Sequence, residues 1–236
     1  MPENSVPNET IDVRKLFERA LVLSKQNTFT LFQGLVVILA VTMIFSVYVV
    51  NTFNISSIED IQKIEDPSFS LAFFFYTLII SPMWAGILMM SLTSARKLKP
   101  SPFQIFQYFK FLPALGLVAV VIDLLTQIGL MLLVLPAFYV YMVSTFIVPL
   151  ITDKQLGPLK AAILSVKMTH QHFNKIALLY LIFFGLMLAG FASLGLGFIW
   201  ILPYIHNVKA ILYQDLFCKT LTTEINRPET TGVFDA

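Results

Sequence analysis

Long apolar runs, separated by short polar segments, occupy most of the 236-residue chain. A helix needs about 20 mostly apolar residues to cross the roughly 30 Å of hydrocarbon in a bilayer. Such runs cover residues 30–50, 69–92, 111–135, 137–151, 176–196 and 198–217. The pattern predicts an all-α fold, a polytopic membrane helical bundle with six transmembrane helices.

The composition indicates lipid as the main solvent. Hydrophobic residues make up 57% of the chain and charged residues 13%, whereas soluble domains carry about 25% charged residues. So few charges could not cover so much apolar surface in water. We therefore expect a single membrane domain over residues 10–218, between a disordered tail (1–9) and a cytoplasmic tail (219–236).

The fourth run is the shortest. Its fifteen residues, 137–151, would rise only about 22 Å as an α-helix. It must begin before Pro136, or form a re-entrant or locally thinned span. The third and fourth runs are separated by almost no loop, as are the fifth and sixth, so each pair is expected to form a tight hairpin.

Basic residues are concentrated in alternate segments between the runs. The segment after the first run has only Lys63, and those after the third and fifth have none. Because cytoplasmic loops carry an excess of Lys and Arg, this alternation predicts that both termini are cytoplasmic. The residues on that side are Arg14, Lys15, Arg19, Lys25, Arg96, Lys97, Lys99, Lys110, Lys154, Lys160, Lys167, Lys175, Lys219 and Arg227.

Amphipathic helices are predicted at about residues 11–25, 101–110 and 157–174, each directly before a span. In the third of these, apolar residues recur at helical spacing while Lys160 and Lys167 lie on another face. Such helices are expected to lie in the inner headgroup layer, with the apolar face toward lipid and the basic face toward anionic headgroups. The three units of amphipathic helix and two spans either repeat one ancestral unit or share only this patterning.

One part of the chain resembles a known family. Residues 124–136 read LLTQIGLMLLVLP and residues 148–157 read VPLITDKQLG, and an amphipathic helix ending near His172 follows. These segments resemble the YciC-like family of bacterial inner-membrane proteins, whose function is uncharacterised. The resemblance implies a six-span bundle in the bacterial inner membrane, and it supplies no functional residues.

Polar residues inside the predicted spans are the candidate binding residues. Asp123 and Gln127 lie in the third run, and His206, Asn207 and Lys209 lie in the sixth. An ionisable side chain at the bilayer centre costs at least about 2.5 kcal/mol, so these groups should find partners. The two spans run in opposite directions, which places Asp123 at a depth similar to His206 and Lys209. Such a cluster would either pin the two helices together or form a proton or substrate station.

Several chemistries lack the residues they need. The chain has one cysteine, Cys218, and His170 and His172 are two apart, so on a helix they point to different faces. We therefore expect no metal and no cofactor. Soluble-enzyme motifs are absent, and a net charge of +2 is too small to indicate nucleic acid.

The expected function is a non-enzymatic envelope role in which the protein contacts membrane lipid, a protein partner or a second copy of itself. The alternative is a small transporter or channel that uses the polar cluster between spans three and six. Small residues also recur every four positions at Gly185, Ala189, Ser193 and Gly197. That stripe would let another helix approach closely, either a helix of the same chain or one of a homodimer.

Overall fold

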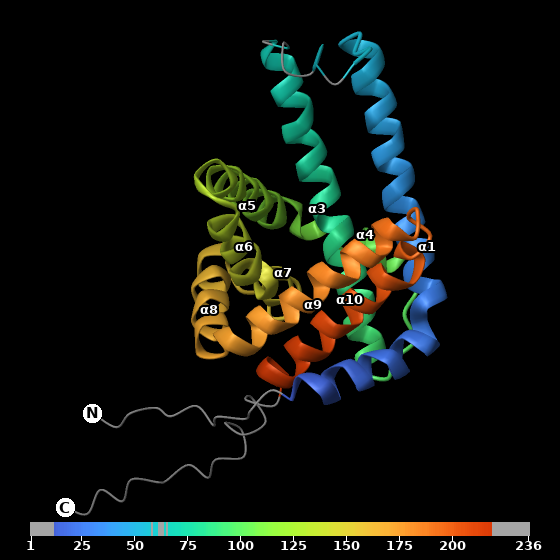
Figure 1. Ribbon diagram of the computed structural model, residues 1–236, viewed down its shortest axis with the longest axis vertical. Coiled ribbons are helices and arrows are strands. Elements are labelled where there is room, and N and C mark those ends of the chain that lie inside the picture. The colour runs from blue at the N-terminus through green and yellow to red at the C-terminus, as the bar shows by residue number, and fades with distance from the viewer. Residues whose placement is uncertain (1–11, 58, 61–63, 65, 219–236) are drawn as a thin grey trace, which may run out of the picture.

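The computed structural model describes residues 12–57, 59, 60, 64 and 66–218, and this part of the chain contains helices and no strand (Figure 1). The all-α prediction is confirmed. The predicted tails at 1–9 and 219–236 lie outside the described residues. In chain order the elements are α1 (Val13–Thr52), α3 (Pro67–Ala95), α4 (Gln104–Gln107), η1 (Tyr108–Phe111), α5 (Leu112–Leu132), α6 (Val134–Val143), η2 (Ser144–Phe146), α7 (Ile147–Thr152), α8 (Pro158–Gln171), α9 (Phe173–Ala192), α10 (Phe198–Tyr213) and η3 (Gln214–Cys218).

Five helical stretches of the described chain are long and apolar enough to cross a membrane, which identifies a multi-pass membrane protein. They are Val13–Thr52, Pro67–Ala95, Gln104–Leu132, Val134–Thr152 and Phe173–Ala192. The sixth predicted span corresponds to α10, which has 16 residues and is followed by η3, a π-helical turn of five. Taken alone, α10 is shorter than the roughly 20 residues of a typical span.

Helix α1 joins the first predicted amphipathic helix and the first span without interruption. Asp12 caps its start by accepting a hydrogen bond from the backbone N–H of Lys15 at 3.2 Å. The helix changes direction between a first part at the base of the molecule and a second part that rises beside α3 (Figure 1). Within α1 the Thr28 hydroxyl donates to the Ser24 carbonyl at 2.6 Å, a bond to the residue four positions earlier that often bends helices.

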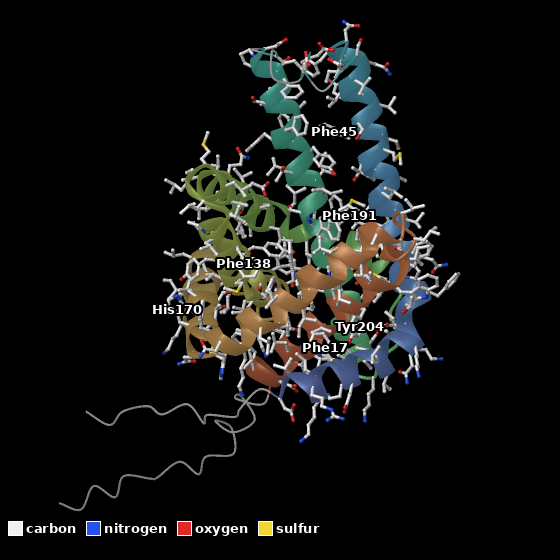
Figure 2. All side chains as sticks on the ribbon, in the orientation of Figure 1. Phe17, Phe45, Phe138, His170, Phe191 and Tyr204 are labelled. Atoms are coloured by element: carbon white, nitrogen blue, oxygen red, sulfur yellow. The ribbon has the colours of Figure 1, made fainter. Side chains whose placement is uncertain are left out.

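The rising part of α1 and the first half of α3 form a hairpin held by aromatic side chains. Phe45 of α1, labelled in Figure 2, stacks on Tyr76 of α3 with ring centroids 4.3 Å apart. It also meets Phe73 edge-to-face at 5.2 Å. The Tyr76 hydroxyl is hydrogen-bonded to Thr42 at 2.8 Å, so the pair satisfies its polar atoms within the hairpin.

The main core lies where α10 packs against α1, α3 and α9. Leu16 and Ala20 of α1, Val208 and Leu212 of α10, and Phe146 of η2 are almost fully buried there. A second, smaller core includes Ile105 of α4, and there α3 approaches α4 closely, because a Cβ on Gly86 would lie 2.6 Å from the Ile105 Cα. Glycine is required at this position because a larger side chain would collide with the backbone.

Helices α5 and α6 form the tight hairpin that the third and fourth runs predict. The chain turns at Leu133, and a Cβ on Gly129 would lie 2.7 Å from the backbone nitrogen of Ala137. The fourth run does begin before Pro136, at Val134, but it is not one α-helix. The 3₁₀ turn η2 separates α6 from α7.

The break at η2 is stabilised by a side chain from α8. The buried Ser165 hydroxyl donates to the Val143 carbonyl and accepts a hydrogen bond from the Phe146 N–H at 3.2 Å. Irregular backbone is tolerated at membrane depth only where its polar groups find partners within the protein or a cavity. Ser165 supplies those partners here.

The second predicted amphipathic helix, residues 101–110, is interrupted. It consists of the four-residue helix α4 followed by the 3₁₀ turn η1, which leads into α5. The third, residues 157–174, corresponds to α8, with Pro158 at its first turn. It ends at Gln171, and α9 begins two residues later at Phe173.

Candidate functional site

Asp123 and Gln127 do not meet the sixth predicted span. Both side chains are exposed on α5, and Asp123 has the Thr77 hydroxyl of α3 as a hydrogen-bond partner. Helix α5 packs against α3 and α6, and this arrangement turns Asp123 away from α10. The expectation that Asp123 is buried against the sixth span is therefore wrong, because similar depth in a bilayer does not place two residues on facing sides of their helices.

His206 contacts α3 instead of α5. Its ring stacks on Trp84 with centroids 5.8 Å apart and an interplanar angle of 16°. The Nδ1 atom is buried and has no hydrogen-bond partner among the residues that the structure describes. The imidazole therefore acts in packing between α10 and α3.

Asn207 is the centre of a buried amide cluster between α10 and α1. It exchanges two hydrogen bonds of 2.9 Å with Asn27, and its Nδ2 also donates to the Ser24 hydroxyl at 2.9 Å. Three polar side chains thus satisfy one another at the junction of the first and last helices. The cluster therefore holds α1 and α10 together.

Lys209 points between two tyrosines, and these four side chains, Lys209, Tyr141, Tyr180 and Thr145, are called the Lys209 cluster below. The Lys209 Nζ lies 5.0 Å from the centroid of Tyr141 in α6 and 5.5 Å from that of Tyr180 in α9. It donates to the Tyr141 hydroxyl at 3.4 Å. The two tyrosine rings meet edge-to-face at 5.4 Å, and the Tyr180 hydroxyl is bonded to Thr145 of η2.

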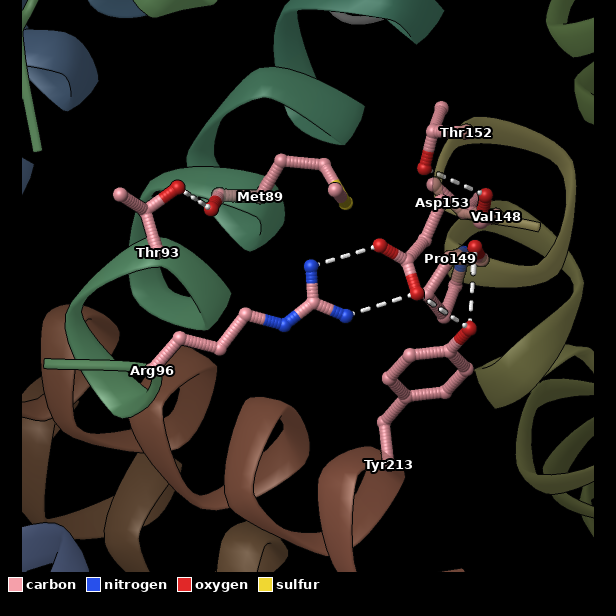
Figure 3. A network of polar contacts seen from close by, with 8 residues as sticks. All are labelled: Met89, Thr93, Arg96, Val148, Pro149, Thr152, Asp153 and Tyr213. Atoms are coloured by element: carbon pink, nitrogen blue, oxygen red, sulfur yellow. Dashed lines mark hydrogen bonds and ion pairs between the residues drawn. The ribbon is translucent and has the colours of Figure 1, made fainter. Parts of the chain in front are cut away.

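A second polar network, which sequence reasoning missed, joins three elements at one end of the bundle (Figure 3). Arg96, at the end of α3, makes a bidentate pair with Asp153, which follows α7, at 2.7 and 2.8 Å. The Tyr213 hydroxyl of α10 donates to the same carboxylate at 3.1 Å. Burial raises the pKa of the Asp153 carboxyl, but the hydrogen bonds and charge of Arg96 and the bond from Tyr213 outweigh it and hold the pKa below its usual value.

A related pair connects the two ends of the described chain. Arg19 of α1 contacts Asp215 of η3 at 2.6 Å. Together with the network around Arg96, this pair gathers four segments at one end of the molecule: the start of α1, the end of α3, the turn after α7 and the end of α10. Basic residues are concentrated in and beside these four segments.

Helix α8 exposes an apolar stripe next to lysines. Leu159, Ile163 and Val166 lie on one face and are 74%, 61% and 38% exposed, and these three residues are called the α8 stripe below. Lys160 and Lys167 are exposed beside it. A third face is buried against the protein and consists of Ala161, Ser165, Met168 and Thr169.

The first amphipathic segment differs from α8, because protein covers most of its apolar face. Leu16, Ala20 and Leu23 are buried, and Phe17 packs on Tyr204 of α10 with centroids 5.9 Å apart (Figure 2). The expectation that this face of residues 11–25 lies against lipid is wrong for Leu16 and Ala20, whereas Leu21 is 53% exposed.

No helix of the described residues lies against the centre of the small-residue stripe on α9. Gly185 and Ala189 are exposed, and a Cβ built on Gly185 would meet nothing within 4 Å. These two residues therefore have no packing partner among the described residues. At the other end of the stripe, Ser193 donates to the Gly190 carbonyl at 2.7 Å and accepts from the Gly197 N–H at 2.8 Å, which shapes the turn into α10.

No group of three or more His, Cys, Asp or Glu side chains suited to a metal ion occurs among the described residues. His170 is bonded to the Tyr139 hydroxyl, whereas His172 lies between α8 and α9.

Comparisons of the chain with protein-family models, curated proteins and solved structures find no match.

Proposed function

We propose that the protein is a six-span component of the bacterial inner membrane that binds anionic lipid at its cytoplasmic surface and has a structural, non-enzymatic envelope role. The observation that carries this proposal is the exposed α8 stripe with Lys160 and Lys167 beside it. An apolar face that enters the bilayer boundary while flanking lysines reach anionic headgroups is the arrangement of an interfacial helix. Kinship with the YciC-like family is part of this proposal.

The ion pairs support an even number of crossings. Arg19 near the start of the described chain lies 2.6 Å from Asp215 near its end, so the two regions lie on the same side of the protein. Helix α10 followed by η3 provides a sixth helical segment. The proposed topology places this end, with both termini, in the cytoplasm.

The apolar residues and the lysines of α8 are expected to have different roles, membrane attachment for the first and lipid selectivity for the second. A fully buried Leu, Ile or Val side chain contributes about 1.5–3 kcal/mol, so the α8 stripe holds the helix in the boundary with any lipid. Each lysine near an anionic surface adds about 1 kcal/mol. Removing Lys160 and Lys167 is therefore expected to lower the selectivity for anionic lipid and to leave α8 in the membrane.

Spin-labelled lipids test this directly in vesicles that contain the protein. The ratio of association constants for phosphatidylglycerol and phosphatidylcholine is expected to fall several-fold in the Lys160→Gln/Lys167→Gln variant. The matched Lys160→Arg/Lys167→Arg variant keeps the charge and should keep the ratio. Equal ratios in the wild type and the Gln variant would refute the role of α8.

The transporter alternative has less support. It depended on a polar cluster between spans three and six, and the structure separates Asp123 on α5 from His206, Asn207 and Lys209 on α10. Of these, Asn207 is engaged in hydrogen bonds within the bundle. No geometry in the described part of the chain favours transport over lipid binding.

A further inference from the structure

We infer that the Lys209 cluster binds the phosphate of a single phospholipid between α6, α9 and α10, at a site separate from the surface of α8. The first observation is an excess of hydrogen-bond donors. Lys209 has three N–H groups and has the Tyr141 and Tyr180 hydroxyls as hydrogen-bond partners, which leaves one N–H, while the Tyr141 hydroxyl accepts its bond and retains its own hydrogen. The remaining N–H of Lys209 and the hydroxyl of Tyr141 are two neighbouring donors that suit an oxyanion.

The second observation is an uncompensated charge. Within the described residues no carboxylate lies at ion-pair distance from the Lys209 amine, whose partners are the two tyrosines. A cation–π contact contributes about 0.5–2 kcal/mol, but it does not neutralise the charge of the ammonium. An anion that meets the ammonium directly would neutralise that charge.

The third observation is access. Tyr141 is 51% exposed, and the cluster adjoins η2, where the fourth predicted span is broken. Tyr180, by contrast, is buried and held by Thr145. The cluster thus has a fixed wall and an open side, and a ligand can enter beside Tyr141 without displacing a helix.

The fourth observation is depth. Lys209 precedes Tyr213 by four residues on α10, which is one turn or about 6 Å. Tyr213 reaches the carboxylate of Asp153, so the cluster lies one turn from the polar end of the bundle. A headgroup phosphate of the adjacent leaflet is at the right level, while its acyl chains would extend along the exposed apolar surface of α9 at Leu181 and Phe184.

Native mass spectrometry of the full chain released from detergent micelles tests the inference. With phosphatidylglycerol added, the wild type is expected to retain one tightly bound lipid. Lys209→Met should weaken this binding at least tenfold and Tyr141→Phe about three- to tenfold, whereas Lys209→Arg should retain it. Tyr139→Phe is the matched control, because Tyr139 lies on the same helix but is bonded to His170.

Three further results decide the ligand and the site. Diacylglycerol, which has the same chains without phosphate, should not bind there, and equal binding would overturn the inference. Competition by inorganic phosphate at millimolar concentration would support an oxyanion site filled from solution, and its absence would support a lipid source. If Lys209→Met and Tyr141→Phe both retain the lipid while Lys160→Gln/Lys167→Gln loses it, the inference fails and the proposed role of α8 stands.

Discussion

Asn27 and Asn207 form a reciprocal pair of amide hydrogen bonds, each 2.9 Å long, although 180 residues separate them in the chain. Their side chains are 2% and 0% exposed. The pair joins α1 to α10 about two helical turns from Arg19 on one side and from Asp215 on the other, and these two residues form an ion pair. It therefore fixes the first and last helices of the described chain against each other.

Replacing Asn207 with Leu should destabilise the protein by about 1–2 kcal/mol. The change leaves the Asn27 amide and the Ser24 hydroxyl buried without their partner, and an unsatisfied buried polar group costs free energy that a satisfied one does not. Unfolding in a mild detergent, followed by circular dichroism, measures the loss. Asn27→Leu/Asn207→Leu should recover part of it, whereas a double variant whose loss equals the sum of the single losses would contradict the pairing.

The network around Arg96 should contribute to folding stability, and this contribution should be lost in the acid pH range. The pKa of Asp153 is held below its usual value in the folded protein, so the contribution is fully present above the unfolded pKa of about 3.9 and is lost as pH falls through the lower folded value. Between pH 8 and 5 the melting temperature should therefore not respond to this group.

Arg96→Met should reverse the sign of this pH dependence, so that the ionised Asp153 destabilises the fold at neutral pH and the destabilisation is relieved as pH falls through the raised folded pKa. Without the guanidinium, burial is the main influence on Asp153 and raises its pKa. Melting temperatures from pH 3 to pH 7 provide the measurement. Arg14→Met is the control, because Arg14 is exposed and pairs only with Glu18 on its own helix; an identical change in both variants would rule out a specific role for the Arg96–Asp153 pair.

Gly86→Ala should lower stability by about 1–3 kcal/mol, the usual cost of overpacking. The new Cβ would lie 2.6 Å from the Cα of Ile105, and a backbone atom cannot move aside as a side chain can. Gly185→Ala is the matched control in another helix, because its Cβ would meet nothing within 4 Å. A neutral Gly86→Ala would mean that α3 and α4 are not packed this closely.

The hydropathy of the sequence predicted most of the helices, because a long apolar run must leave water and in a membrane it does so as a helix. The α8 stripe also followed from helical spacing, since Leu159, Ile163 and Val166 do face outward. The same spacing could not tell lipid from protein as the covering material. It gave the wrong environment for Leu16 and Ala20, which are buried in the protein, and it left open what packs on Gly185, which no helix of the described residues covers.

The candidate site was predicted only in part, for a related reason. Sequence position gives the depth of a residue in a span but not the side of the helix on which it lies. Asp123 and Lys209 were therefore predicted to lie at a similar depth, and yet their side chains have different neighbours, Thr77 for one and two tyrosines for the other. The pairing of Arg96 with Asp153 links residues 57 positions apart, and no local pattern in the sequence signals it.

The most direct test of the proposed architecture is the side of the membrane on which each end of the chain lies. In a Cys218→Ser background, the single-cysteine variants Ser5→Cys, Ser57→Cys and Thr231→Cys can be treated with a membrane-impermeant thiol reagent in intact spheroplasts and after permeabilisation. Six spans with cytoplasmic termini predict that Ser57→Cys is labelled in intact spheroplasts and that the other two are labelled only after permeabilisation. Labelling of Thr231→Cys in intact spheroplasts, with Ser5→Cys protected, would show an odd number of crossings and contradict the account.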